Sequence, residues 1–317
     1  MFWILFLLIA GFGFVILGAD FLVKGSSSLA RRFHVSELII GLTIVAFGTS
    51  TPELVVNTVA SLEGHNDMVL GNIIGSNNFN MFIILGISAM IFPLTIQRST
   101  ILKEIPYSLI AAFAVLILAN DVLLFNKKTD ILSRTDGLIL IGFFVVFMIY
   151  IVRNLQDESM KNSPSESYYS VPKTLLLLGG GFTGLIAGGK LAVDNAIALA
   201  QMMGISERII GLTIVAAGTS LPELATSAVA AYRKKSDIAI GNVVGSGIMN
   251  IFFILAVSLL IFPVKYHINF NIDLTLLITG TMLLLFFTYT GKKAKVDRWE
   301  AGVFLAIYIG YSIFLLK

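Results

Sequence analysis

An internal repeat constrains this chain more than any other feature of its sequence. Residues 41–55 read GLTIVAFGTSTPELV and residues 211–225 read GLTIVAAGTSLPELA, with 12 of 15 positions identical. A second pair, GNIIGSNNFNMFIILGIS at 71–88 and GNVVGSGIMNIFFILAVS at 241–258, shares 9 of 18 positions at the same offset of 170 residues. The chain is therefore predicted to contain two homologous halves.

The composition indicates that both halves lie in a membrane. Of the 317 residues, 56% are hydrophobic and 13% are charged, against roughly 25% charged in average soluble proteins. The mean hydropathy is +0.90. The chain has no cysteine, which excludes disulfides, thiolate metal sites and cysteine nucleophiles. The class that this composition favours is an all-α polytopic membrane protein.

Apolar segments long enough to cross a bilayer recur along the chain and predict ten transmembrane helices. The N-terminal segment lacks a basic region before its apolar run, so we interpret it as a first membrane helix and not as a cleaved signal. With these spans, 15 Lys and Arg residues fall on one side and 6 on the other. The richer side is predicted to be cytoplasmic, which leaves both termini outside the cell membrane. The predicted spans are 2–23, 38–62, 68–92, 101–120, 136–154, 173–194, 207–231, 238–262, 272–290 and 298–316.

Five spans per half is an odd number, so the second half must enter the membrane inverted relative to the first. Inverted repeats are a transporter architecture that binds substrate near the bilayer midplane. We assign the first repeat to 1–155, a cytoplasmic linker to 156–172 and the second repeat to 173–317. A duplication without functional meaning would explain the likeness of the halves. It would not explain why the identities gather on Gly, Thr, Ser, Pro, Glu and Asn.

The GTSTPE and GTSLPE motifs predict that helices 2 and 7 are broken. Pro52 and Pro222 each remove a backbone N–H and disturb nearby carbonyls, and such carbonyls must face protein, water or an ion when they lie in a membrane. A glutamate follows each proline directly, and ionisable groups at mid-membrane are costly and usually functional. Hydroxyl residues three and four positions earlier share the face of each glutamate. The side chains of this motif that we select are Glu53, Ser50, Thr49, Glu223, Ser220 and Thr219. The carbonyls that the prolines free or disturb include those of Ala46, Phe47 and Gly48, and of Ala216, Ala217 and Gly218.

The second motif adds further oxygen atoms. Ser76 and Asn80 share one helical face, as do Ser246 and Asn250. Together with the first motif they form an all-oxygen set, which suits Ca²⁺ and Na⁺ better than soft transition metals. The alternative is that these side chains only hold helices together, and for Asn72 and Asn242 we favour that structural role. Gly71, Gly75, Gly241 and Gly245 in the same motif are expected to permit close helix packing.

Other polar residues point to no separate activity. Asp20 and Lys24 in the first helix correspond to Lys190 and Asp194 in the sixth, with the charges exchanged, and we interpret all four as interfacial or snorkelling residues. The three histidines, His34, His65 and His267, fall in connections and form no predicted cluster. No phosphate-binding loop, nucleophile elbow or HExxH motif is present, which argues against an enzyme.

The paired motifs resemble those of the sodium/calcium exchanger family, within the cation/calcium antiporter superfamily, in its compact prokaryotic form. The resemblance implies cation ligands from both repeats at the positions selected above, and it singles out the carbonyls of Ala46 and Ala216 among the disturbed carbonyls. It also implies a sliding movement of helices 1 and 6 against the other eight. This chain departs from the family pattern at one position, because some exchangers carry Asp where this chain has Asn250. Only two carboxylates then remain in the set, which makes a K⁺-coupled exchange less expected.

The function that we predict is exchange of Ca²⁺ for Na⁺ by a secondary antiporter using alternating access. One alternative keeps the fold and couples Ca²⁺, or another divalent cation, to H⁺, because glutamates in low dielectric can hold protons. A cation channel is the third possibility, although pores are usually built on rotational symmetry. The expected partners are the small cations and the lipid bilayer. No cofactor, nucleic acid or obligate protein partner is expected.

Overall fold

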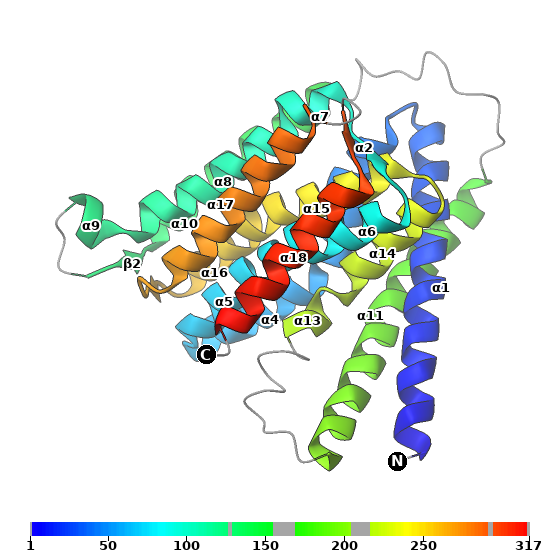
Figure 1. Ribbon diagram of the computed structural model, residues 1–317, viewed down its shortest axis with the longest axis horizontal. Coiled ribbons are helices and arrows are strands. Elements are labelled where there is room, and N and C mark those ends of the chain that lie inside the picture. Colours follow the sequence, from blue (N-terminus) through cyan, green and yellow to red (C-terminus); the bar gives the residue numbers. More distant parts are fainter. Residues whose placement is uncertain (1, 126–128, 155–168, 204–215, 291–293, 316–317) are drawn as a thin grey trace.

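The computed structural model describes residues 2–125, 129–154, 169–203, 216–290 and 294–315 (Figure 1). Most of the predicted linker 156–172 and the beginning of the predicted span 207–231 lie outside the described residues, as does the side chain of Ala216. The described chain is mostly helical. Its elements are α1 (Phe2–Arg32), α2 (Glu37–Ile40), the π-helical segment η1 (Gly41–Val45), α3 (Ala46–Thr49), α4 (Thr51–Glu63), α5 (Asn66–Asn78), the π-helical segment η2 (Phe79–Ile84), α6 (Leu85–Ile91), β1 (Leu94–Thr95), α7 (Arg98–Leu102), α8 (Glu104–Ala119), α9 (Asp121–Phe125), β2 (Ile131–Leu132), α10 (Arg134–Asn154), α11 (Val171–Met202), α13 (Ala216–Thr219), α14 (Leu221–Tyr232), α15 (Ser236–Met249), the π-helical segment η4 (Asn250–Leu255), α16 (Ala256–Ile261), β3 (Val264–Lys265), α17 (Phe270–Phe287), β4 (Lys295–Val296) and α18 (Arg298–Leu315).

The described residues contain seven helices that are long and apolar enough to cross a membrane. An eighth span is present if the segments Glu37–Thr49 and Thr51–Glu63, which meet at a bend of 47°, are counted together. The prediction of a polytopic helical membrane protein is thus confirmed. The predicted span 298–316 corresponds to the helix α18, which is not among these seven. The count of ten spans therefore stays a prediction.

Both GTSxPE motifs interrupt a helix, and they do so at the serine. Ser50, with φ −80° and ψ 8°, separates α3 from α4. Ser220, with φ −89° and ψ 9°, separates α13 from α14. Pro52 and Pro222 lie in the first turn of the helix that follows, where a missing N–H costs no helical hydrogen bond. The breaks therefore precede the prolines instead of occurring at them.

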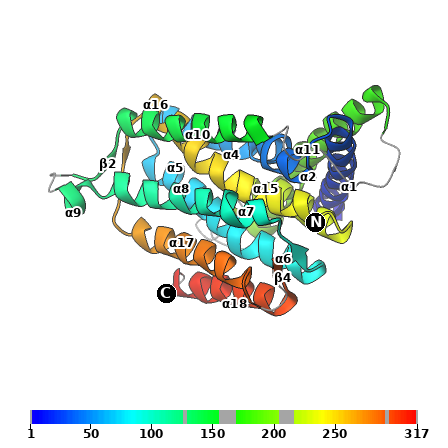
Figure 2. The ribbon, with the colours of Figure 1, turned by 90° about the horizontal axis from the view of Figure 1, so that it is seen from above.

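Helices α1 and α11 form a tight antiparallel pair at one edge of the bundle (Figures 1 and 2). A Cβ atom added to Gly11 would lie 2.6 Å from the backbone nitrogen of Ala192, and one added to Gly18 would lie 2.7 Å from that of Leu185. Residue numbers rise along α1 as they fall along α11, which defines the antiparallel direction. The two helices have 31 and 32 residues, so both continue beyond the predicted spans 2–23 and 173–194.

Two short antiparallel strand pairs join the two halves of the chain. The strand β1 pairs with β4 through Leu94 and Val296, and β2 pairs with β3 through Ile131 and Lys265. The strands β1 and β3 occupy matched positions, each directly after the second motif of its half. Because every pair takes one strand from each half, the halves interlock instead of forming separate bundles.

The glycines of the second motif behave differently in the two halves. A Cβ atom added to Gly241 would lie 2.8 Å from the carbonyl oxygen of Leu38, and one added to Gly245 would lie 2.8 Å from that of Leu42. The predicted close packing is therefore present in the second half. Gly71 and Gly75 meet nothing within 4 Å among the described residues. The segment at the matched position in the other half, 208–215, is not described.

Candidate functional site

The centre of the candidate site is a crossed pair of serine–glutamate hydrogen bonds. The Oγ atom of Ser50 lies 3.0 Å from Oε1 of Glu223, and the Oγ atom of Ser220 lies 3.1 Å from Oε1 of Glu53. Each serine donates to the carboxylate of the other half, although neither motif alone predicts this exchange. Both glutamates are only 1% exposed. Each lies in the first turn of its helix, α4 or α14, where the partial positive charge of the helix end stabilises a carboxylate.

A third serine extends this network on one side only. Ser246, which is fully buried, has its Oγ atom 3.0 Å from that of Ser50. Its counterpart Ser76 is also buried, but its hydroxyl has no hydrogen-bond partner among the described residues. The two repeats therefore present the same residues in different hydrogen-bonding states. The side of Ser246 is closed by protein contacts, whereas the Ser76 hydroxyl is left available to a ligand.

The predicted ligands include five buried oxygen atoms that find no hydrogen-bond partner within the described part of the chain. An unpaired buried polar atom costs roughly 1–3 kcal/mol, so such atoms are rare unless a bound species completes them. Among the described residues no three His, Asp or Glu side chains form a metal-binding group. A bound cation would thus depend on neutral oxygens in addition to the two carboxylates. The unpaired atoms are Oε2 of Glu53, Oε2 of Glu223, Oγ of Ser76, Oδ1 of Asn80 and Oδ1 of Asn250.

The two threonines contact asparagines of the opposite half. The Thr49 hydroxyl lies 3.0 Å from Oδ1 of Asn242, and the Thr219 hydroxyl lies 3.5 Å from Oδ1 of Asn72. Both asparagines thus hold the broken helices together, as the sequence favoured. Thr49 also lies 3.1 Å from the carbonyl oxygen of Val45 within its own helix. In this arrangement the threonine hydroxyls contact protein oxygens beside the serine–glutamate network.

Two residues behind these asparagines were not selected from the sequence. The amide of Asn72 donates to Oδ1 of Asn57 at 2.8 Å, and that of Asn242 donates to Oγ of Ser227 at 2.9 Å. Asn57 and Ser227 are fully buried and are separated by the repeat offset of 170 residues. The sequence signal for these two residues was that both matched positions are polar. A search for identical residues in the two halves does not find such a pair.

A third residue missing from the sequence analysis is Asn77, which orients Asn250. The amide nitrogen of Asn77 lies 3.4 Å from the carbonyl oxygen of Gly247, an atom that can only accept. The Asn77 oxygen then accepts from Nδ2 of Asn250 at 3.2 Å. This chain of contacts leaves Oδ1 of Asn250 without a partner. The sequence signal was the asymmetry itself, because Asn77 corresponds to Gly247 in the other half.

The backbone at the site departs from the simple expectation of freed carbonyls. The carbonyl oxygen of Ala46 accepts the N–H of Ser50 at 2.9 Å and lies 3.3 Å from the Thr49 hydroxyl, so it is not left without a partner. The π-helical segments η2 and η4 contain Asn80 and Asn250, respectively. Wider turns of this kind occur frequently at functional sites because they redirect side chains. The sequence did not predict them.

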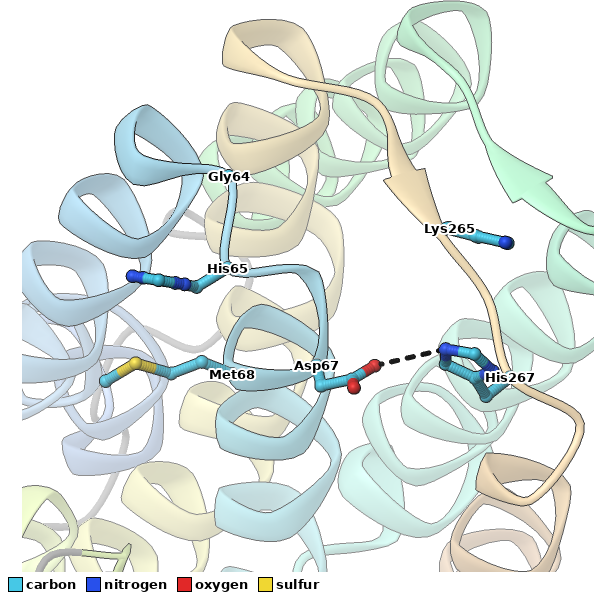
Figure 3. Close-up of a pocket in the computed structure, with 6 residues that line it drawn as sticks. All are labelled: Gly64, His65, Asp67, Met68, Lys265 and His267. Carbon is cyan, nitrogen blue, oxygen red and sulfur yellow. Dashed lines mark ion pairs between the residues drawn. The ribbon is translucent and has the colours of Figure 1, made fainter.

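Two of the histidines, His65 and His267, line a surface pocket of about 600 Å³, where each contacts a different carboxylate (Figure 3). Nε2 of His267 lies 3.6 Å from Oδ1 of Asp67, which forms an ion pair when the histidine is protonated. The ring of His65 points away from this pair in Figure 3, and its Nε2 lies 3.4 Å from Oε2 of Glu63. All four side chains are more than half exposed, so this pocket is distinct from the buried network.

Comparisons with known proteins identify the family of this chain. The family model described as "Sodium/calcium exchanger protein" matches residues 3–153 and 173–317. An uncharacterized membrane protein of Methanocaldococcus jannaschii is 35% identical over 314 residues, covering 96% of this chain and 97% of that protein. The sodium/calcium exchanger MaX1 of Methanosarcina acetivorans is 31% identical over 347 residues, covering 98% of this chain and 97% of that protein.

Solved structures give the same result. The structure of the sodium-calcium exchanger NCX_Mj soaked with Na⁺ and Ca²⁺ aligns with a TM-score of 0.82 and 35% sequence identity. The alignment covers 98% of this chain and 97% of that chain. Sequence, family model and fold therefore agree over nearly the entire length, in a family of sodium/calcium exchangers. This multi-pass membrane protein belongs to the sodium/calcium exchanger family.

Proposed function

We propose that this protein is a secondary antiporter that exchanges Ca²⁺ for Na⁺ by alternating access through one shared site. One observation carries the proposal. Two fully buried glutamates, one from each half, are each held by a serine of the other half, and each keeps one carboxylate oxygen that no described residue pairs. Ca²⁺ takes oxygen ligands of this kind. The resemblance to named sodium/calcium exchangers supports the choice of ions.

Competition between the ions follows from electrostatics. Two charged carboxylates are costly in a site that is both empty and buried, because nothing replaces the water they have lost. The charge of one Ca²⁺ equals that of the two glutamates, and Na⁺ would use the same oxygens. A carrier that reorients only when the site is loaded then couples the two ion flows.

We also propose that the halves are inverted repeats of five spans each, with boundaries at 1–155 and 173–317 and both termini outside. The antiparallel pairing of α1 with α11, which begin the two halves, supports this topology. The symmetric exchange of strands between the halves supports it too. On this basis α1 ends on the cytoplasmic side at Arg31 and Arg32, and α4 ends on the outer side at Glu63.

The test is Na⁺-driven Ca²⁺ uptake into inside-out membrane vesicles. Replacement of either glutamate, Glu53→Gln or Glu223→Gln, is expected to abolish uptake because one anionic ligand is lost. The matched control is Glu300→Gln, since Glu300 is equally buried but accepts from Thr290 and from the backbone of Asp297, away from the site. Uptake at the unmodified rate in either site variant would contradict the assignment.

A further inference from the structure

An ionic cluster ties the α1–α11 pair to the rest of the protein at one end. Asp20 of α1 accepts from the guanidinium group of Arg233, which directly follows α14. Lys24, one turn along α1, places its Nζ atom 2.7 Å from the other carboxylate oxygen of Asp20. The Asp20 side chain is only 20% exposed. The cluster therefore joins helix α1 to helix α14, along which α1 also packs.

The repeat offset maps this cluster onto three residues of opposite charge. Asp20 corresponds to Lys190, Lys24 to Asp194 and Arg233 to Glu63, each 170 residues away. Every charge in the set is reversed. A matched reversal of all three charges is expected if an ion pair is kept between the sixth predicted helix and the end of the broken helix. Snorkelling residues that act independently would not require matched reversals. The reversal of charge is evident from the sequences of the first helices at the first two positions, and the third position adds the end of the broken helix.

The second set of charges is apart in this structure. The side chains of Glu63, Lys190 and Asp194 are exposed, and no ion pair joins Glu63 to Lys190 among the described residues. The helices that carry them, α4 and α11, make no contact comparable to that of α1 with α14 within the described chain. One of two symmetry-related interfaces is therefore closed while the other is open.

The proposed topology gives this reversal a physical reason. Arg233 lies on the cytoplasmic side, where Lys and Arg are favoured, and Glu63 takes its place on the outer side. Lys190 lies toward the outer end of α11, against that bias, so its position needs a partner. Glu63 supplies the opposite charge at the matched place. An inverted pair of interfaces with one closed at a time is what rocking between two states requires.

We propose that Glu63 and Lys190 form a second ionic latch, which closes the outer side when the Asp20–Arg233 latch opens. The inference rests on the proposed transport cycle. It adds that one ionic latch stabilises each of the two end states of that cycle. In the described structure the cytoplasmic latch is closed. After the movement, α11 packs on α4 as α1 now packs on α14, and the Lys190 ammonium reaches the Glu63 carboxylate.

Because the chain has no cysteine, the latch can be tested by cross-linking introduced pairs in proteoliposomes. Glu63→Cys with Lys190→Cys is expected to react with a short bifunctional thiol reagent, and the cross-link is expected to block Ca²⁺ uptake. Leu62→Cys with Lys190→Cys is the matched control, since Leu62 is exposed but points about 100° away around the helix. Adding Asp20→Asn to the first pair is expected to raise its cross-linking rate about fivefold, because loss of a partly exposed ion pair destabilises the opposite state.

A charge exchange provides the second measurement. Glu63→Lys is expected to slow Na⁺-driven uptake, and Glu63→Lys combined with Lys190→Glu is expected to restore it. Full uptake without cross-linking at 63 and 190, or equal cross-linking of the Leu62 control, overturns the latch and leaves the proposed function standing. Cross-linking at 63 and 190 in a protein that shows no Na⁺-driven uptake leaves the latch standing and overturns the function.

Discussion

At the scale of single residues, the site depends on contacts that cross between the two halves. Glu53 and Glu223 were recognised because each follows a proline inside an apolar segment. The spacing within each motif placed Ser50 beside Glu53, yet the structure bonds Ser50 to Glu223. Spacing along one helix cannot reveal which segment lies opposite. The supporting residue Asn77 was missed for the same reason.

The crossed serines provide a prediction at this scale. Ser50→Ala or Ser220→Ala removes the hydroxyl donor to the glutamate of the other half. A hydrogen bond to a charged group contributes about 1.5–3 kcal/mol, so Ca²⁺ affinity is expected to fall about tenfold to a hundredfold. The measurement is the Ca²⁺ concentration that gives half-maximal Na⁺-driven uptake.

The control for this prediction is Ser258→Ala. Ser258 is buried, but its hydroxyl donates to the carbonyl oxygen of Ile254 in its own segment of the chain. Its replacement is expected to leave Ca²⁺ affinity unchanged. If the Ser50 and Ser258 variants shift affinity equally, the crossed bond has no specific role.

Asn77 provides a second residue-scale prediction. Asn77→Leu keeps a side chain of similar size but removes the acceptor that holds Nδ2 of Asn250. The Asn250 amide is then free to turn, and Ca²⁺ affinity is expected to fall about tenfold, the scale of one hydrogen bond. Asn77→Asp keeps an acceptor for Asn250 and is expected to retain more affinity than Asn77→Leu. The reverse order in Ca²⁺-dependent uptake would exclude the positioning role.

At the scale of helices, the breaks and wide turns determine where the site forms. The prolines made a break in each second helix predictable. The position of the break at Ser50 and Ser220, and the π-helical segments at Asn80 and Asn250, were not predictable. Both depend on how neighbouring helices pack. The length of α1 was also underestimated, because Asp20 and Lys24 pair with each other along the helix instead of marking its end.

Pro52→Ala tests whether the break itself is needed. Alanine supplies an N–H that can bond to the preceding turn, which favours a straighter helix. We expect Ca²⁺ uptake to fall severalfold while the protein remains folded, as judged by its thermal unfolding in detergent. Pro106→Ala is the control, since Pro106 lies in the first turn of α8, and Arg98–Ala119 counts as one span and not as a bent pair among the described residues. Equal loss of uptake in both variants would argue against a role for the break.

At the scale of the whole molecule, the repeat made the two-half organisation and the membrane class predictable from the sequence. The family assignment follows from the same motifs and is confirmed over nearly the entire chain. The interlocking of the halves through β1–β4 and β2–β3 was not predictable, because strands of two residues carry no periodic signal. The unequal packing of the two ends was likewise not predictable, since the matched residues of the two halves carry no signal of which interface is closed.

Exchange of Ca²⁺ for Na⁺ at one site with two glutamates can be measured as Ca²⁺ flux into proteoliposomes, with Na⁺, K⁺ or H⁺ gradients imposed one at a time. We expect Ca²⁺ accumulation with the Na⁺ gradient alone, saturating with Ca²⁺ and lost in Glu53→Gln and Glu223→Gln. Accumulation driven by a pH gradient in sodium-free medium, with none driven by Na⁺, would contradict it.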